Sequence, residues 1–418
     1  MSGTIDTGKQ RKRNLLLGLI RSREGACKAV LKEWSGLSME SVIRYVEELT
    51  REGLITTAGY SRPPVGRKAA YLTIRPEGCF FLGLRFSPLG LNGLILDFSG
   101  EVRCRREELF YEGVPAGEVL ERLCVCAAGL MEELGGDRER LLGIGVAVPG
   151  LVDRENGVGI RYVHIPGWEN VPVREILEER LGLPVTVEHS LKATALAAAR
   201  LPENRGIQDL LFLLVGRGVG MAILADGEIY PGAANLSGEI GHIFSASNGV
   251  RCRCGRTGCL ETVAGSPAVV RRLAEGLEAG RFPLLRRELE AGTPLSVELL
   301  ARGAALGDPD ASEEVRQVSR CVGEAVSTAV TLLNPEKLIL SGEIGAAPGF
   351  AEGVLSELRD RCFPEALKML RYAYQPQDNW FDARAAAALA YERCFGLSPA
   401  ERKELNRWEP LAGPVGII

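Results

Sequence analysis

The sequence predicts a mixed α/β protein with a small basic helical module at its N-terminus and a much larger body. Three observations predict this arrangement. The chain has 418 residues, more than one ordinary hydrophobic core accommodates. Residues 1–75 contain 14 Lys or Arg and 7 Asp or Glu, whereas the rest of the chain is acidic and brings the total to −4. From about residue 79 onwards, apolar runs of strand length alternate with helical patterns, which is typical of α/β folds with a largely parallel sheet.

Composition indicates a globular protein of a reducing compartment. Hydrophobic residues make up 46% of the chain and charged residues 25%. We find no apolar run of about 18 residues, and the polar N-terminus lacks the core of a signal peptide, so we expect no membrane span and a cytoplasmic location. The spacing of the 11 cysteines does not suggest a disulfide framework. Outside the loop discussed below, most cysteines are therefore expected to be small buried hydrophobes.

Three helices are predicted in the N-terminal module. Residues 13–23 place aliphatic side chains on one helical face, and residues 25–36 repeat apolar side chains at a spacing of four. Gly36 makes the turn into the third helix, for which Ser38 is a suitable N-cap, and Gly53 ends that helix. This order of helix, helix, turn and helix is typical of a helix-turn-helix.

Two short β-like runs follow the third helix, at 53–59 and 69–74, and flank a basic loop that reads as a wing. A polyanion such as double-stranded DNA is the expected partner of this basic module. The DNA-binding residues predicted in the third helix are Ser38, Met39, Glu40, Ser41 and Arg44, of which the last four are expected to reach base edges. Phosphate or minor-groove contacts are expected from Arg62, Arg67 and Lys68 in the wing, together with Arg11, Lys12 and Arg13.

The alternative for this module is a small helical domain that binds a protein. The third helix is acidic, which weakens the DNA-binding interpretation. Glu47, Glu48 and Glu52 can face away from DNA, whereas Glu40 cannot and is expected to accept a hydrogen bond from a cytosine amine.

A cysteine-rich loop in the body predicts a metal site. Cys252, Cys254 and Cys259 lie within eight residues of one another, but a tetrahedral zinc site needs four ligands. The alternatives are a redox pair or loop cysteines without a metal.

Residues 79–395 resemble the ROK family, which unites sugar kinases with repressors that respond to xylose, N-acetylglucosamine or the state of glucose uptake. Three segments carry the resemblance: LSGEIGHI (236–243), RCRCGRTGCLE (251–261) and LNPEKLILSG (333–342). A winged helix-turn-helix in front matches the repressor branch. The resemblance implies a body with the two-lobed actin-like, or ribonuclease-H-like, ATPase fold.

The resemblance also implies a division into domains. The expected ranges are a winged helix-turn-helix at 1–75, lobe 1 at 76–195 completed by a C-terminal helix at about 375–395, lobe 2 with the zinc site at 196–374, and a C-terminal extension at 396–418.

The resemblance supplies the fourth zinc ligand, His242, and hence a structural His-Cys-Cys-Cys site. It also implies sugar binding by Glu239, by Glu261 and by the other ring nitrogen of His242. The zinc would then orient groups that bind the sugar. His189 and Ser190 occupy the positions at which ROK kinases carry an Asn-Asp pair, and each can still form one hydrogen bond to a sugar.

The features that a ROK kinase needs are largely missing. Arg85 stands where a kinase has the Asp of its phosphate loop, and Pro88 and Leu89 replace small residues. Ser190 stands at the position of the catalytic base, and serine does not take a proton unaided. The glycines of the run VGRGVG, residues 215–220, more simply serve a tight hairpin. We therefore expect no kinase activity and no bound ATP.

The sequence thus predicts a sugar-responsive DNA-binding transcriptional regulator, most simply a repressor of carbohydrate metabolism genes. Its expected partners are a two-fold symmetric DNA operator, a sugar or sugar-phosphate effector, and a second copy of the chain in a homodimer or tetramer. The alternatives are a sugar kinase with an accessory DNA-binding module, a scaffold whose body binds a protein partner, and a body that only dimerises.

Overall fold

The structure is a computed structural model that describes residues 7–22, 26–60, 69–245, 249–290, 292–398 and 401. It divides into two compact units: the first contains residues 1–206 and 379–418, and the second contains residues 207–378. The second unit is therefore an insertion in the first. The boundary expected at 195/196 falls inside a helix that the first unit keeps whole. The roles expected for these ranges, a DNA-binding module and a lobe with a zinc site, stay predictions.

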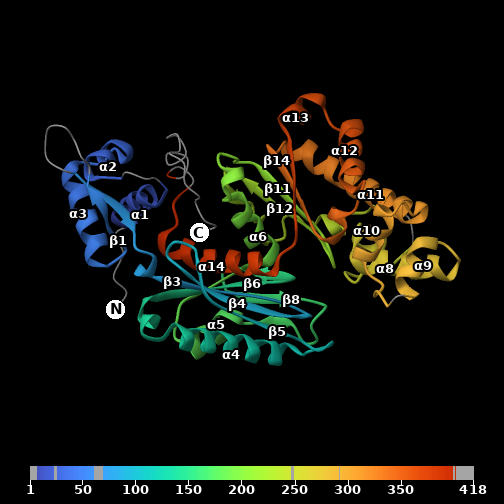
Figure 1. The fold of residues 1–418 in the computed structure, drawn as a ribbon, viewed down its shortest axis with the longest axis horizontal. Helices are drawn as coiled ribbons and strands as arrows, with labels where there is room; N and C mark the ends of the chain where they lie inside the picture. Colours follow the sequence, from blue (N-terminus) through green and yellow to red (C-terminus); the bar gives the residue numbers. More distant parts are fainter. Residues whose placement is uncertain are drawn as a thin grey trace. The chain divides into compact units, whose positions relative to one another are not determined.

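The N-terminal elements follow the expected order of three helices and a two-stranded antiparallel sheet (Figure 1). Their bounds are α1 Thr7–Ser22, α2 Lys28–Ser35, α3 Met39–Arg51, β1 Ile55–Tyr60 and β2 Ala70–Ile74. Gly36 adopts a left-handed conformation between α2 and α3, and the side chain of Ser38 accepts a hydrogen bond from the backbone N–H of Ser41. These local features confirm the predicted turn and N-cap. The wing loop, with Arg62, Arg67 and Lys68, lies outside the described residues.

A five-stranded sheet forms the centre of the first unit, in the order β10-β6-β3-β4-β5. Strands β3, β4 and β5 are antiparallel, whereas β6 and β10 are parallel to β3. The bounds are β3 Phe80–Ser87, β4 Gly90–Asp97, β5 Val102–Leu109, β6 Leu141–Val148 and β10 Val185–His189. A smaller sheet contains β7 Leu151–Asp153, β8 Val158–Arg161 and β9 Glu169–Val171.

Helices cover both faces of the five-stranded sheet because the central strands β3, β4 and β6 are apolar on both sides. Phe80 and Leu82 pack with α4 and α5, whereas Phe81 packs with α14. The helices are α4 Ala116–Leu134, α5 Val173–Leu181, α6 Ser190–Ala199 and α14 Asn379–Phe395, with short 3-10 helices η1 Pro76–Gly78, η2 Gly135–Arg140 and η3 Pro202–Asn204. Figure 1 shows α14 lying across the sheet, on the face opposite α4.

Two glycines let α14 approach the sheet closely. A Cβ at Gly145 would lie 1.7 Å from the carbonyl oxygen of Ala386, and a Cβ at Gly83 would lie 2.1 Å from that of Ala383. Any larger side chain at these positions would push the helix away, so the backbone-to-backbone contact requires glycine.

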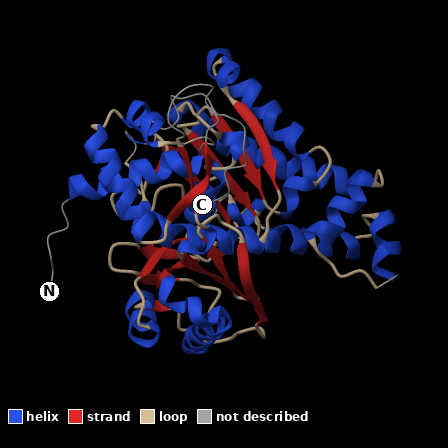
Figure 2. Ribbon diagram, turned by 60° about the vertical axis from the view of Figure 1, so that its left-hand side comes forward, coloured by secondary structure: helices blue, strands red, loops and turns tan. Residues whose placement is uncertain are grey.

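The second unit also has a five-stranded sheet, in the order β13-β12-β11-β14-β15, with helices packed around its strands (Figure 2). The strands are β11 Leu210–Val215, β12 Val219–Ala225, β13 Glu228–Ile229, β14 Lys337–Ser341 and β15 Arg371–Gln375. The helices are α7 Glu261–Ala264, α8 Ser266–Glu278, α9 Pro283–Glu290, α10 Val297–Ala305, α11 Pro309–Leu333, α12 Phe350–Arg361 and α13 Pro364–Met369, with 3-10 helices η4 Ile240–His242 and η5 Glu343–Ala346.

The structure corrects the ends of two expected helices. The C-terminal helix begins at Asn379 rather than near 375, because residues 371–375 instead pair with β14 as β15. A second helix, expected at about 316–333, begins at Pro309, where Asp308 caps it through its side chain. In the described part of the chain, no helix is both long and apolar enough to cross a membrane.

Candidate metal centre and DNA-binding surface

His242 is placed by a glycine-rich segment that lies directly against β12. The backbone N–H of Met221 donates to the carbonyl of Gly238 at 2.9 Å. Gly238 has φ +83°, and a Cβ there would lie 1.7 Å from the carbonyl oxygen of Met221. A Cβ at Gly241 would lie 2.1 Å from the carbonyl oxygen of Val219. Only glycine fits at both contacts, and the contacts fix where η4 presents His242.

A tight turn brings Cys252 and Cys254 together. The N–H of Cys252 donates to the carbonyl of Arg256 at 2.7 Å, and the N–H of Gly255 donates back to Cys252 at 2.9 Å. Gly255 has φ +94°, which this turn requires. A β-bridge between Phe244 and Cys259 then joins the turn to the segment that follows His242.

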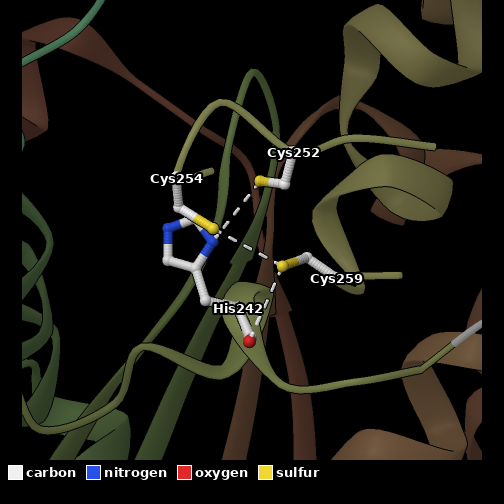
Figure 3. A group of neighbouring side chains, drawn as sticks. All are labelled: His242, Cys252, Cys254 and Cys259. Atoms are coloured by element: carbon white, nitrogen blue, oxygen red, sulfur yellow. Dashed lines mark hydrogen bonds between the residues drawn. The ribbon is translucent and has the colours of Figure 1, made fainter. Parts of the chain in front are cut away.

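Four ligand atoms converge where these segments meet (Figure 3). The three Sγ atoms and one imidazole nitrogen all lie within 4.8 Å of one another. Cys252 Sγ lies 3.7 Å from Nδ1 of His242, and Cys254 Sγ lies 3.6 Å from Cys259 Sγ. Sulfur atoms about 2.3 Å from a tetrahedral zinc are themselves about 3.8 Å apart, so both the donor set and its spacing fit zinc.

The protonation of the thiols also suits a cation. Burial tends to raise the pKa of Cys254, but hydrogen bonds from the backbone and side chain of Arg256 and from the neighbouring thiols lower it to about 6. Burial, followed by the hydrogen bond with Cys254, raises the pKa of Cys259 to about 12, and burial also raises that of Cys252. Of the three thiols, that of Cys254 therefore loses its proton most readily. A divalent cation would stabilise the other two thiolates and release their protons.

The predicted sugar ligands of the second unit surround this cluster. Nε2 of His242 lies 3.9 Å from a carboxylate oxygen of Glu239, on the ring edge opposite the nitrogen that faces Cys252. Glu261 accepts the N–H of Val219 at 3.2 Å, and its other oxygen lies 3.9 Å from Cys252 Sγ. The structure thus places both carboxylates beside the cysteine–histidine group.

The other two predicted effector residues, His189 and Ser190, belong to the first unit, at the junction of β10 and α6. Burial, with the nearby charge of Lys192, lowers the pKa of His189 to about 4, so its ring is neutral at pH 7. Sequence reasoning missed Glu188, whose buried carboxylate accepts the N–H of His189 at 2.8 Å and pairs with Arg154 at 3.3 Å. A glutamate inside an apolar strand was the signal that could have identified it.

The face of α3 that points to solvent carries most of the predicted base-reading residues. Met39, Glu40 and Arg44 are exposed, and Ile43 lies between them. Ser38 and Ser41 are tied together at the cap. Ile43 was missed by sequence reasoning, although its spacing of four from Met39 places it on the same face.

The acidic side of α3 is neutralised within the module. Glu48 pairs with Lys9 at 3.1 Å, Glu52 pairs with Arg13, and Glu47 lies 3.9 Å from Lys28. The expectation that these glutamates can face away from DNA agrees with this pairing. The expectation for Arg13 needs correction, because its side chain is largely buried against Glu52 and is not available to a phosphate.

The structure also describes the segments that the resemblance compares with the phosphate loops of a kinase. Pro88 and Leu89 form the tight turn between β3 and β4. Arg85 is largely buried and lies 4.0 Å from Asp382. Gly216 and Gly218 close the hairpin between β11 and β12, with the N–H of Gly216 donating to Gly218 at 3.0 Å.

Comparisons with known proteins agree with this geometry. The ROK family model matches residues 93–378. The DNA-binding transcriptional dual regulator NagC of Escherichia coli strain K12 is 29% identical over 389 residues, which cover 92% of each chain. A crystal structure described as a ROK family transcriptional regulator, homologous to the E. coli Mlc protein, has a TM-score of 0.79 at 25% identity and covers 96% of this chain and 100% of its own. A ROK hexokinase from Thermus thermophilus has a TM-score of 0.61 at 26% identity and covers 75% of this chain and 98% of its own.

Proposed function

The chain belongs to the ROK family, and from this premise we propose that it is a sugar-responsive transcriptional regulator that represses carbohydrate metabolism genes. The observation that carries the proposal is the extent of the similarity. The regulator structure matches nearly the whole of this chain. The hexokinase matches along almost its entire own length, yet a quarter of this chain has no counterpart in it. The proposed winged helix-turn-helix at 1–75 would make up most of that quarter.

The proposed DNA contact is made by the exposed face of α3. Met39, Glu40 and Arg44 would meet base edges from the major groove, and the wing would meet the backbone. Because a two-fold operator presents two half-sites, we propose that the chain binds DNA as a homodimer or as a tetramer of two such pairs.

The proposed metal is a structural zinc held by His242, Cys252, Cys254 and Cys259. Its positive charge would stabilise the thiolates, and its geometry would fix the segments that carry Glu239 and Glu261. These carboxylates and Nε2 of His242 are then the groups that bind sugar hydroxyls in the second unit. His189 and Ser190 remain the effector residues proposed for the first unit.

We propose that the body does not phosphorylate its sugar. The support is that the segment expected to hold a phosphate loop instead contains Arg85, which is buried beside Asp382, and the Pro88–Leu89 turn. A coupled ADP-release assay with glucose, xylose and N-acetylglucosamine tests this point. Sugar-dependent ADP release by the purified protein would favour the kinase alternative.

The direct test of DNA binding is an electrophoretic mobility shift with the DNA upstream of the gene that encodes this chain. We expect a shift that weakens as salt increases, because phosphate contacts release counterions. Arg44→Ala should weaken the shift, whereas Arg316→Ala, which removes an exposed helix arginine of the second unit, should not. Folded protein that causes no shift at low salt would overturn the proposal.

Metal content and effector binding are tested separately. Metal analysis should find about one zinc per chain, and His242→Ala should lose it, whereas Cys321→Ala, outside the cluster, should retain it. A thermal-shift screen of glucose, xylose, N-acetylglucosamine and the 6-phosphates of glucose and N-acetylglucosamine should find one compound that raises the melting temperature. Glu239→Gln and Glu261→Gln should reduce that shift. If no compound raises the melting temperature, the dimerising or protein-binding alternatives gain support.

A further inference from the structure

A polar network runs from an exposed glutamate of β5 through buried side chains of the first unit to a predicted effector residue. Glu107 of β5 accepts from Asn92 of β4 at 3.1 Å, and Asn92 accepts from Arg85 of β3 at 3.4 Å. Arg85 lies 4.0 Å from Asp382, in the first turn of α14. The other oxygen of Asp382 accepts from Thr194 of α6 at 2.7 Å.

The hydroxyl of Thr194 has a choice of two acceptors. Besides Asp382, the carbonyl oxygen of Ser190 lies 3.0 Å away, within the first turn of α6. A hydroxyl has one hydrogen, so it bonds fully either to its own helix or to α14. The carboxylate is the stronger acceptor because the bond to it is charge-assisted and largely buried. Thr194 therefore donates its hydrogen to Asp382 and joins α6 to α14, and the carbonyl oxygen of Ser190 does not receive that hydrogen bond.

The far end of α14 is part of the core of the winged module. Side chains from α1 and α3 pack in one continuous cluster with Tyr391 and Phe395. The side-chain amide of Asn14 in α1 donates to the carbonyl oxygens of Cys394 and Gly396, at 3.5 and 3.4 Å. The guanidinium of Arg21 lies over the ring of Tyr391, 4.8 Å from its centroid. One helix thus contacts α6 at its first turn and the DNA-binding module at its last.

We propose that Asp382 is a positioning residue for the sugar response: it accepts the Thr194 hydroxyl and thereby couples the start of α6, with Ser190, to the helix that supports the winged module. The inference rests on the proposed function, because it needs an effector at Ser190 and an operator at α3. A sugar that binds at Ser190 changes whether the Thr194 hydroxyl donates to Asp382 or to the carbonyl of Ser190. The position of α14 changes with this bond, and α14 transmits the change to α1.

The experiment compares full-length variants by two readouts. The first is the fluorescence anisotropy of a labelled operator with and without the compound that gives the largest thermal shift in the sugar screen. The second is amide hydrogen exchange in α14 and in α1, measured without sugar. Thr194→Val removes the hydroxyl and keeps the shape, whereas Thr194→Ser keeps the hydroxyl. Thr328→Val is the matched control, because that hydroxyl donates to the carbonyl oxygen of Glu324 in its own helix, α11.

In the wild-type protein, the sugar should change operator affinity by about 5- to 150-fold. This factor should fall towards one in Thr194→Val and in Asp382→Ala, be intermediate in Asp382→Asn, and be retained in Thr194→Ser and Thr328→Val. Of the threonine variants, only Thr194→Val should show faster amide hydrogen exchange in both α14 and α1. A purely local role of Thr194 would leave α1 unchanged.

Two results would overturn the inference. One is a sugar factor in Thr194→Val within twofold of wild type, and the other is unchanged exchange in α1. If wild-type protein binds no operator or ignores every sugar, the proposed function fails instead, and the exchange data still decide whether Thr194 couples α6 to the module.

Discussion

Replacing Gly238 by alanine tests whether the contact with β12 places the metal ligand His242. The new methyl would meet the carbonyl oxygen of Met221 at 1.7 Å, at a backbone position with φ +83°. The left-handed conformation costs about 1–2 kcal/mol for a residue with a Cβ, and relieving the clash costs about 1–3 kcal/mol. Moving the segment also breaks the hydrogen bond from Met221, which contributes about 1 kcal/mol. We therefore expect a loss of about 3–6 kcal/mol in the free energy of unfolding.

Gly249 provides the matched control, because it has φ +66° and nothing within 4 Å of its Cβ position. Gly249→Ala should lower the free energy of unfolding only by the cost of the left-handed conformation, about 1–2 kcal/mol. Both variants are compared by denaturant titration and by zinc content per chain. If Gly238→Ala matches Gly249→Ala in stability and keeps the zinc content of the wild type, the contact with β12 is not what fixes His242.

Three further predictions concern the operator, the core and pH. Arg44→Ala should weaken operator binding roughly 10- to 100-fold, as measured by anisotropy, because one specific base contact is lost; equal loss on random DNA would contradict base reading. Gly145→Ala should lower the melting temperature because its methyl would meet Ala386, whereas Gly117→Ala in α4, with nothing within 4 Å, should leave it equal or higher. The pKa of His189, lowered to about 4 by burial and by the charge of Lys192, predicts stability that is present above pH 6.5 and lost as the pH falls to 4, because only the unfolded chain binds the proton there. When melting temperatures are measured at a series of pH values, His189→Gln should reduce the loss of stability between pH 6.5 and 4. An unchanged dependence on pH would show that His189 does not contribute to it.

Local patterns predicted the elements of the winged module and of most of the body. The spacing of Val42, Val46 and Leu49 places them on one face of a helix, and these residues are buried in α3. The start of α11 was missed because the periodic apolar pattern begins later than its cap at Asp308. The strand at 371–375 was not predicted because its pairing partner, β14, lies more than 30 residues earlier in the chain.

The candidate site was predictable only in part. The three cysteines indicated a metal by their spacing alone, but His242 required the family resemblance, since one histidine ten residues away has no distinctive local pattern. The bond between Thr194 and Asp382 joins residues 188 positions apart, and no local signal predicts such a contact. The pairing of Arg13 with Glu52 likewise depends on how α1 packs against α3.

The packing of α14 into the core of the winged module has a consequence for synthesis of the chain. The module is translated before the inserted unit, whereas the helix that completes its core is translated after the entire inserted unit. A nascent or prematurely terminated chain therefore exposes the apolar surface of α1 that Tyr391 and Phe395 normally cover. Nonsense mutations late in the gene should accordingly yield unstable, degraded protein rather than a free DNA-binding fragment that acts on its own.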